Sequence, residues 1–193
     1  PRYLPNNTTA NIYNWIVTAV FPGLFYIESP DRLFGIGVSS SQSVVPGQIL
    51  TVRGTMTTIS GERRISPTSV SGTTLTSQLQ PWGMSNRLLG GRAVGPYTAG
   101  IIGMASPNNV GLRVRVWGKV TYADTVSGYF YMSDGSGAGD NSSHVGVRVT
   151  GTVPVGQGVD PVGRFVQVTG ISTCFQSGSL YRLVRASDVQ LVQ

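Results

Sequence analysis

The chain has little of the side-chain chemistry from which most catalytic sites are built. Its 193 residues include one cysteine, one histidine and one lysine, Lys119. A catalytic or structural zinc site needs three or four nitrogen, sulfur or carboxylate ligands close together, and serine triads need a histidine base. The eight acidic residues leave a glycosidase carboxylate pair as an open chemistry, but no pair is distinguished by its setting. We therefore expect a non-enzymatic protein without a cofactor.

Charge is also scarce. Charged residues make up 11% of the chain, against roughly 25% in ordinary soluble domains. Serine, threonine, glutamine, asparagine and glycine must then cover much of the surface, and such a coat packs readily against neighbours. No apolar run reaches the roughly 18 residues typical of a membrane span. Because the first residue is Pro1 rather than methionine, we expect an exported chain whose signal peptide has been removed.

Four residues carry weak signals of chemistry. A lone Cys174 cannot form a disulfide within the chain, and its apolar surroundings predict a buried small hydrophobe. His144 is predicted to be a solvent-facing strand residue. Asp134 and Asp140 flank a glycine-rich loop that could wrap calcium, but the spacing lacks further ligands and favours a plain hairpin loop.

A short motif occurs twice in the chain. Residues 23–27 (GLFYI) return as residues 128–132 (GYFYM), and each copy is followed by an acidic residue and a turn. Downstream of each copy, residues 46–54 parallel residues 162–170 in order and polarity. Repetition at a fixed order indicates repeated structural units. The sequence therefore predicts two small β modules of one kind.

Alternation of apolar and polar residues predicts the strands of each module. In the second half, alternation predicts Val145, Val147 and Val149 to point inward, and the five expected strands are 110–120, 128–132, 144–150, 164–171 and 180–191. The first half also gives five, at 12–20, 24–28, 33–39, 48–59 and 65–75. Between the halves, one short helix is expected to end at Leu88-Leu89, with Gly90 as its left-handed cap.

These strand and turn patterns resemble the oligonucleotide- and oligosaccharide-binding barrel, the OB-fold. The resemblance covers residues 110–193 well and residues 11–75 loosely. It implies an all-β chain of two small five-stranded OB-like barrels in tandem. The expected divisions are an extended segment at 1–10, a first module at 11–78, a Gly/Pro-rich linker at 79–109 and a second module at 110–193. Residues 82–91 and 110–120 also resemble modules of exported bacterial proteins.

Nucleic-acid binding is one function that such a fold can serve. The formal charge is +6, and cations with aromatic residues could form a basic stacking platform for single-stranded DNA or RNA. The candidate residues are Arg113, Arg115, Trp117, Lys119, Tyr129, Tyr131, Arg148 and Arg182. Carbohydrate binding is a weaker alternative. Both remain secondary because the cations are sparse and mostly isolated.

Self-assembly is the function that the sequence favours. The segment at 1–10 belongs to neither repeat, and it contains two prolines that favour an extended form. Tyr3, Leu4 and Pro5 could anchor it on a neighbouring subunit, although a frayed terminus is the other interpretation. A contact of this kind that does not close produces a filament. We therefore expect a structural subunit of an extracellular, bacterial fibre or surface filament, with other copies of itself as partners.

Overall fold

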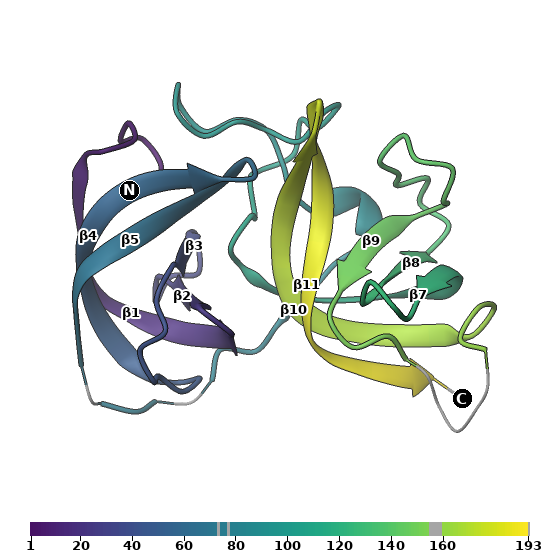
Figure 1. Cartoon of the computed structure of the whole chain (residues 1–193), viewed down its shortest axis with the longest axis horizontal. Coiled ribbons are helices and arrows are strands. Elements are labelled where there is room, and N and C mark those ends of the chain that lie inside the picture. The colour runs from purple at the N-terminus through teal and green to yellow at the C-terminus, as the bar shows by residue number, and fades with distance from the viewer. Residues whose placement is uncertain (73, 77, 155–159, 193) are drawn as a thin grey trace.

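The computed structural model describes residues 1–72, 74–76, 78–154 and 160–192. Within these residues the chain is built almost entirely of strands, which form two barrels side by side along the longest axis (Figure 1). The all-β class and the two OB-like barrels are thereby confirmed. No helix among these residues has the length and apolarity to cross a membrane.

The first barrel closes through five strands. They are β1 (Thr9–Phe21), β2 (Leu24–Glu28), β3 (Gly35–Val38), β4 (Ile49–Ile59) and β5 (Glu62–Ser71). Their order around the barrel is β1-β2-β3-β5-β4, with β1 and β4 paired to close it. All pairs are antiparallel except β3 with β5, which is parallel. This is the strand order of the OB-fold.

The second barrel repeats that order. Its strands are β7 (Arg113–Asp124), β8 (Tyr129–Ser133), β9 (Val147–Thr150), β10 (Phe165–Ser177) and β11 (Ser179–Val192). The sheet runs β10-β11-β9-β8-β7, and pairing of β10 with β7 closes it. The parallel pair is again the third strand with the fifth, β9 with β11. A two-residue strand, β6 (Trp82–Gly83), adds to β7 in parallel.

Glycines in the duplicated motif have matching conformations. Gly23 and Gly128 turn the first hairpin of each barrel at φ of 70° and 68°. Gly47 and Gly163, each just before the fourth strand, have φ of 90° and 89°. These values lie in the left-handed region, which glycine adopts without steric cost. The sequence repeat therefore encodes the same two backbone turns in both barrels.

Alternation in β7 supplies one side of the second core. Val114, Val116 and Val120 point inward and are fully buried, while Arg115 and Trp117 point out. The first barrel has its own core, which includes Phe25, Ile27, Val52, Met56 and Ile65. Each barrel thus buries its own apolar cluster, as the alternating pattern predicts.

Strand β9 begins later than predicted. It starts at Val147, and Val145 is 64% exposed instead of pointing inward. The preceding Gly146 has a φ of 107° and lies directly against the backbone of Met132, which interrupts the alternation. For the same reason His144 lies in the loop before β9 and not in a strand.

The predicted linker packs against the second barrel. The predicted helix is a single 3-10 turn, η1 (Asn86–Leu88), and Gly90 follows it at a φ of 92°. Leu89 is fully buried in the core of the second barrel. Further along, Ile101 packs with Cys174 and Leu180. Residues 79–109 therefore form part of the packed structure.

The two barrels share a buried interface. Ile171 of β10 packs into an apolar cluster with Leu24 and Tyr26 of β2. Beside it, Glu28 at the end of β2 accepts hydrogen bonds from the backbone N–H of Arg113 and, at 3.3 Å, from Nε of Arg32. Contacts of both kinds, apolar and polar, join the barrels directly.

Candidate functional surfaces

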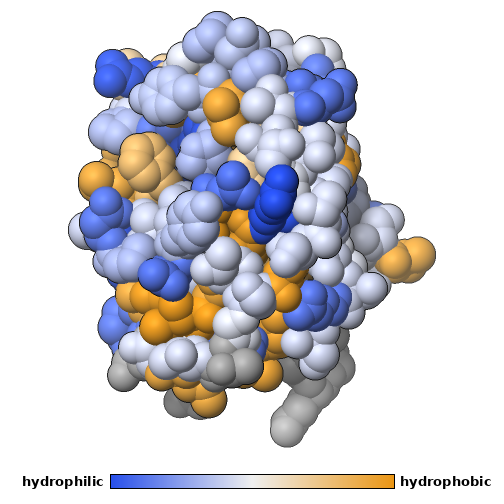
Figure 2. All heavy atoms as spheres, turned by 90° about the vertical axis from the view of Figure 1, so that its left-hand side faces the viewer, coloured by the Kyte–Doolittle hydropathy of each residue, from blue (hydrophilic) through white to orange (hydrophobic). Residues whose placement is uncertain are grey.

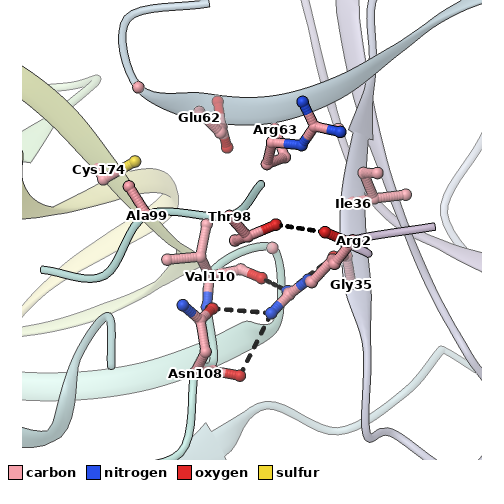
Figure 3. A pocket seen from close by; sticks show the side chains of 13 residues that line it. Arg2, Gly35, Ile36, Glu62, Arg63, Thr98, Ala99, Asn108, Val110 and Cys174 are labelled. Carbon is pink, nitrogen blue, oxygen red and sulfur yellow. Dashed lines mark hydrogen bonds between the residues drawn. The ribbon is translucent and has the colours of Figure 1, made fainter. Parts of the chain in front are cut away.

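The start of the chain lies in a cavity between the barrels. Arg2 is only 3% exposed. Its guanidinium donates to the Gly35 carbonyl at 2.8 Å, to Oδ1 of Asn108 at 2.7 Å, and to the Val110 carbonyl (Figure 3). Burial lowers the pKa of Arg2 to about 10. Among the described residues it forms no ion pair with a carboxylate, so neutral oxygens alone receive its hydrogen bonds.

The neighbouring residues also contact their own chain. The Leu4 side chain packs against the core of the first barrel, and Arg63 donates to the Leu4 carbonyl. Tyr3 is largely exposed, but one side of its ring lies against Gly95. Pro5 is exposed. We refer to residues 1–4 as the N-terminal arm, and to the cavity that holds it as the socket.

The structure divides the predicted nucleic-acid residues among several places. Arg115, Trp117 and Lys119 share the outer side of β7. Arg113 instead donates from Nη1 to Oε1 of Gln78 at 2.8 Å and to the Leu79 carbonyl at 3.2 Å. It therefore ties β7 to the connection between the barrels. The eight residues do not form one continuous platform.

Arg182 is the clearest correction. It is buried, and its Nη1 donates to the carbonyls of Asn86 at 3.2 Å and Arg87 at 2.8 Å. Its side chain lies on the same side of β11 as the core residue Val184, because residues two apart in a strand share a face. Arg182 thus holds the η1 turn and is absent from any exposed basic face.

An apolar groove lies on the outer side of β7 and β10. It has a volume of about 520 Å³ and is lined by Met84, Arg115, Trp117, Phe165, Gln167 and Val192, among others. Trp117 is 55% exposed and Phe165 is 48% exposed, and their ring centroids are 6.3 Å apart. We refer to this feature as the end groove. Alternation in β7 predicted that Trp117 points outward. The sequence did not indicate that Phe165 lies beside it, because β10 and β7 are far apart in the chain.

A second group of aromatic side chains covers the outer side of β8. The Arg148 guanidinium lies 4.0 Å from the ring centroid of Tyr129. Tyr122 stacks on His144 with centroids 3.8 Å apart. Tyr131 is buried beneath them. We refer to these five residues as the aromatic cluster. It unites three of the predicted residues, Tyr129, Tyr131 and Arg148, with two that were not predicted for this role.

Carboxylates lie beside the aromatic cluster. The Tyr131 hydroxyl donates to Oδ2 of Asp140 at 2.6 Å, and burial, together with this bond, raises the pKa of Tyr131 to about 12. Asp124 lies opposite Tyr129 in the β7–β8 pair. Arg148 of the cluster is therefore accompanied by two acidic side chains outside it, Asp124 and Asp140, a charge balance that does not favour a polyanion.

The glycine-rich loop after β8 holds its carboxylates apart. Asp134 accepts from the Asn86 N–H at 2.8 Å and from the Ser136 N–H at 3.0 Å, while Asp140 binds Tyr131. Within the described ranges, no three His, Cys, Asp or Glu side chains are grouped so that they could hold a metal ion. The hydrogen bonds of Asp134 and Asp140 therefore fix the conformation of the loop.

Cys174 is buried, as predicted. Burial raises the pKa of its thiol to about 12, with a further contribution from the nearby Glu62. A thiol with a raised pKa is protonated and unreactive at neutral pH. The residue therefore serves as packing between the linker and β10.

Comparisons with known proteins do not place the chain in a family. No family model matches it, and no curated protein matches it. A crystal structure of the tetrameric p202 HIN2 aligns over 97% of this chain and 94% of that chain, with a TM-score of 0.37 and 10% identity. A likeness this weak carries no argument about function. The OB-like assignment therefore rests on the strand order of the two barrels.

Proposed function

We propose that this protein is a non-enzymatic structural subunit that assembles with copies of itself into an extracellular filament. The observation that carries the proposal is exposed apolar surface at both ends of the long axis. Contiguous exposed apolar patches on soluble proteins commonly mark interaction sites. The two ends belong to different barrels and present different side chains.

The end groove forms the first of these surfaces. Val192 lines it, and β11 ends with this residue at the far end of the second barrel (Figure 1). Trp117 and Phe165 expose two aromatic rings there, and Leu191 and Val192 are exposed beside them. Large aromatic residues are enriched among those that dominate binding energy at protein interfaces. This end is therefore suited to receive a protruding apolar side chain.

The first barrel presents the second surface. Figure 2 views this end and shows apolar side chains gathered on its lower part. The exposed apolar residues of the first barrel include Tyr13 at 67% and Val45 at 51%, and Leu75, which follows β5, is 64% exposed. Because this end differs from the end groove, a contact between them is heterologous. Such contacts extend into open polymers when the rotation between subunits does not close a ring.

Charge and the barrel interface support the same function. With charged residues at only 11% of the chain, a contact between copies removes few charged side chains from water. The buried contacts of Ile171 and Glu28 fix one barrel on the other. A subunit with a defined angle between its two contact surfaces can propagate a regular polymer. The low-charge polar coat also supports the extracellular location, which immunogold labelling of intact source cells would test.

Electron microscopy of the purified chain tests the proposal directly. We expect regular filaments from the unmodified protein, and we expect Trp117→Ser combined with Phe165→Ser to remain dispersed while it still unfolds in one cooperative thermal transition. Val126→Ser is the matched control because Val126 is exposed in the β7–β8 turn. Dispersed unmodified protein at high concentration, or undiminished filaments from the double variant, would contradict the proposal.

Single-strand nucleic-acid binding is the second candidate function. The specific observation in its favour is the Arg148 guanidinium stacked over Tyr129, beside Tyr122 and His144. Stacking on an aromatic side chain contributes about 1–3 kcal/mol per base. This candidate predicts that a labelled single strand binds in low salt and that Tyr129→Ala weakens binding. Retention no better than that of an inert protein would remove it.

A further inference from the structure

We infer that the aromatic cluster binds a neutral carbohydrate chain made of pyranose sugars. The cluster lies on β7, β8 and β9 and in the loop before β9, and it shares no residue with the end groove. The inference therefore does not depend on the proposed filament. It depends on how the aromatic rings are held, on how the guanidinium is placed, and on the charges beside them.

Strand pairing brings the cluster together. Tyr131 of β8 lies opposite Tyr122 of β7 on one side and opposite Arg148 of β9 on the other. Tyr129 is two positions before Tyr131 and shares its face of the sheet. The ring centroids of the three tyrosines lie 6.0 to 6.3 Å apart. Tyr131 is buried whereas Tyr122 and Tyr129 are half-buried, so two partly open rings are supported by a buried third ring.

These rings suit the apolar side of a sugar. The face of an aromatic ring carries partial negative charge, and the C–H groups on one side of a pyranose carry partial positive charge. His144 enlarges the surface, because its ring stacks on Tyr122 with the centroids 3.8 Å apart. The rings already hold one another in place, so binding orders few side chains and loses little conformational entropy.

Arg148 supplies hydrogen-bond donors to this surface. Its guanidinium lies 4.0 Å from the ring centroid of Tyr129 and 5.4 Å from that of Phe175. Within the described ranges it makes no ion pair, and its buried Nε has no hydrogen-bond partner. Contacts with aromatic rings therefore position this group. Because the side chain as a whole is half-buried, its terminal N–H groups are the donors that a ligand can reach.

The charges beside the cluster favour a neutral ligand. Asp140 accepts from the Tyr131 hydroxyl at 2.6 Å, and Asp124 lies opposite Tyr129 in the β7–β8 pair. A phosphate backbone would meet these two carboxylates and only one guanidinium, and like charges repel. A sugar hydroxyl both donates and accepts hydrogen bonds. It can therefore accept from Arg148 and donate to Asp124, which no single phosphate oxygen can do.

Titration calorimetry of the full chain tests the inference. The probes are neutral oligosaccharides of glucose, mannose, galactose and N-acetylglucosamine, with a single-stranded oligothymidylate for comparison. We expect saturable binding of at least one neutral oligosaccharide. Tyr129→Ala and Arg148→Gln should each weaken that binding about tenfold, because one removes a stacking surface and the other the guanidinium donors. Each variant is first shown to unfold in one cooperative thermal transition, and either substitution alone suffices for the test.

The matched controls are Tyr13→Ala and Arg53→Ala, which remove an exposed tyrosine and an exposed arginine from the first barrel. They should leave sugar binding unchanged, as should Trp117→Ser combined with Phe165→Ser in the end groove. Absence of binding by all of the neutral oligosaccharides would overturn the inference. So would oligosaccharide binding that Tyr129→Ala and Arg148→Gln leave intact. Binding of the oligothymidylate alone would also overturn it, in favour of the nucleic-acid candidate.

Discussion

Glu62 of the first barrel accepts a hydrogen bond from the Thr173 hydroxyl of the second barrel at 2.7 Å. The same carboxylate oxygen accepts the Tyr26 hydroxyl at 2.8 Å, and the other oxygen pairs with Arg64 at 2.7 Å. Tyr26, Arg64 and Thr173 therefore each donate to the Glu62 carboxylate. Both oxygens of this buried side chain thus have partners, and the junction is sensitive to the loss of any one donor.

Thr173→Val should destabilise the fold. The substitution keeps the shape of the side chain but removes one donor to a buried carboxylate, and a lost hydrogen bond to a charged group costs about 1.5–3 kcal/mol. Urea denaturation should show a lower midpoint with an unchanged slope. Thr68→Val is the control, since Thr68 is exposed and bonds only to the Arg53 carbonyl. Equal effects of the two substitutions would show that the junction bond contributes nothing.

Arg2→Ala should also destabilise the folded chain. It removes the donor to the buried Gly35 carbonyl and the half-buried Val110 carbonyl, and each group left unsatisfied costs about 1–3 kcal/mol. Arg2→Lys should recover only part of the loss because an ammonium lacks the planar fork of a guanidinium. The measurement is the free energy of unfolding for all three chains. A lysine variant as stable as the unmodified chain would contradict this account.

The stability contribution of Glu28 should rise as pH falls from neutral. Burial raises the pKa of Glu28, against smaller opposing effects of the Arg113 N–H and Arg32. A folded pKa above the unfolded value of about 4.3 means that the folded chain binds more protons, so its stability increases as pH falls through the folded pKa toward 4.3. The difference in unfolding free energy between the unmodified chain and Glu28→Gln, measured at several pH values, should show this slope.

Asp31 provides a control of opposite sign. Hydrogen bonds from Ser29 and Leu33 lower its pKa, so its contribution is present above the unfolded value and is lost as pH falls through the folded pKa. The difference between the unmodified chain and Asp31→Asn should therefore shrink in acid. The same slope for both variants would contradict the assigned directions.

Gly47→Ala should cost more stability than Gly163→Ala. The two glycines share the same left-handed φ, so both substitutions carry about 1 kcal/mol or more of backbone strain. At position 47 an added Cβ would lie 2.6 Å from the Thr76 carbonyl oxygen, whereas at position 163 the nearest atom is 3.9 Å away. Chemical denaturation of the two variants measures the difference directly. Equal losses would show that crowding at position 47 relaxes without cost.

The sequence revealed those features that depend on local pattern. The duplicated glycines predicted two barrels with the same turns, and alternation in β7 predicted which valines are buried. The first strand, however, begins at Thr9, inside the segment expected to lie outside both modules. Periodicity could not locate its true start, because pairing with β4 extends it beyond the apolar residues.

The features missed by sequence reasoning depend on partners distant in the chain. Arg2 and Arg182 are both buried. Arg2 bonds to Asn108 and Arg182 to the Asn86 carbonyl, each about a hundred residues away in sequence. Local sequence patterns do not reveal such partners. The positions of the cations in the sequence therefore predicted that Arg182 lies on an exposed basic surface, whereas its side chain is buried. The aromatic cluster was found in part, because Tyr129 and Tyr131 are neighbours in one strand, while the loop that brings His144 onto Tyr122 has no local signal.

The barrel interface has a mechanical consequence for the proposed filament. Two kinds of barrel–barrel junction would alternate along its length. The junction within a chain is covalently connected and holds buried hydrogen bonds such as that of Thr173 to Glu62. The junction between chains is held by noncovalent contacts alone. Under tension or dilution, such a polymer would break at every second junction. Fragments would then contain whole numbers of barrel pairs, and each broken end would be ready to rejoin.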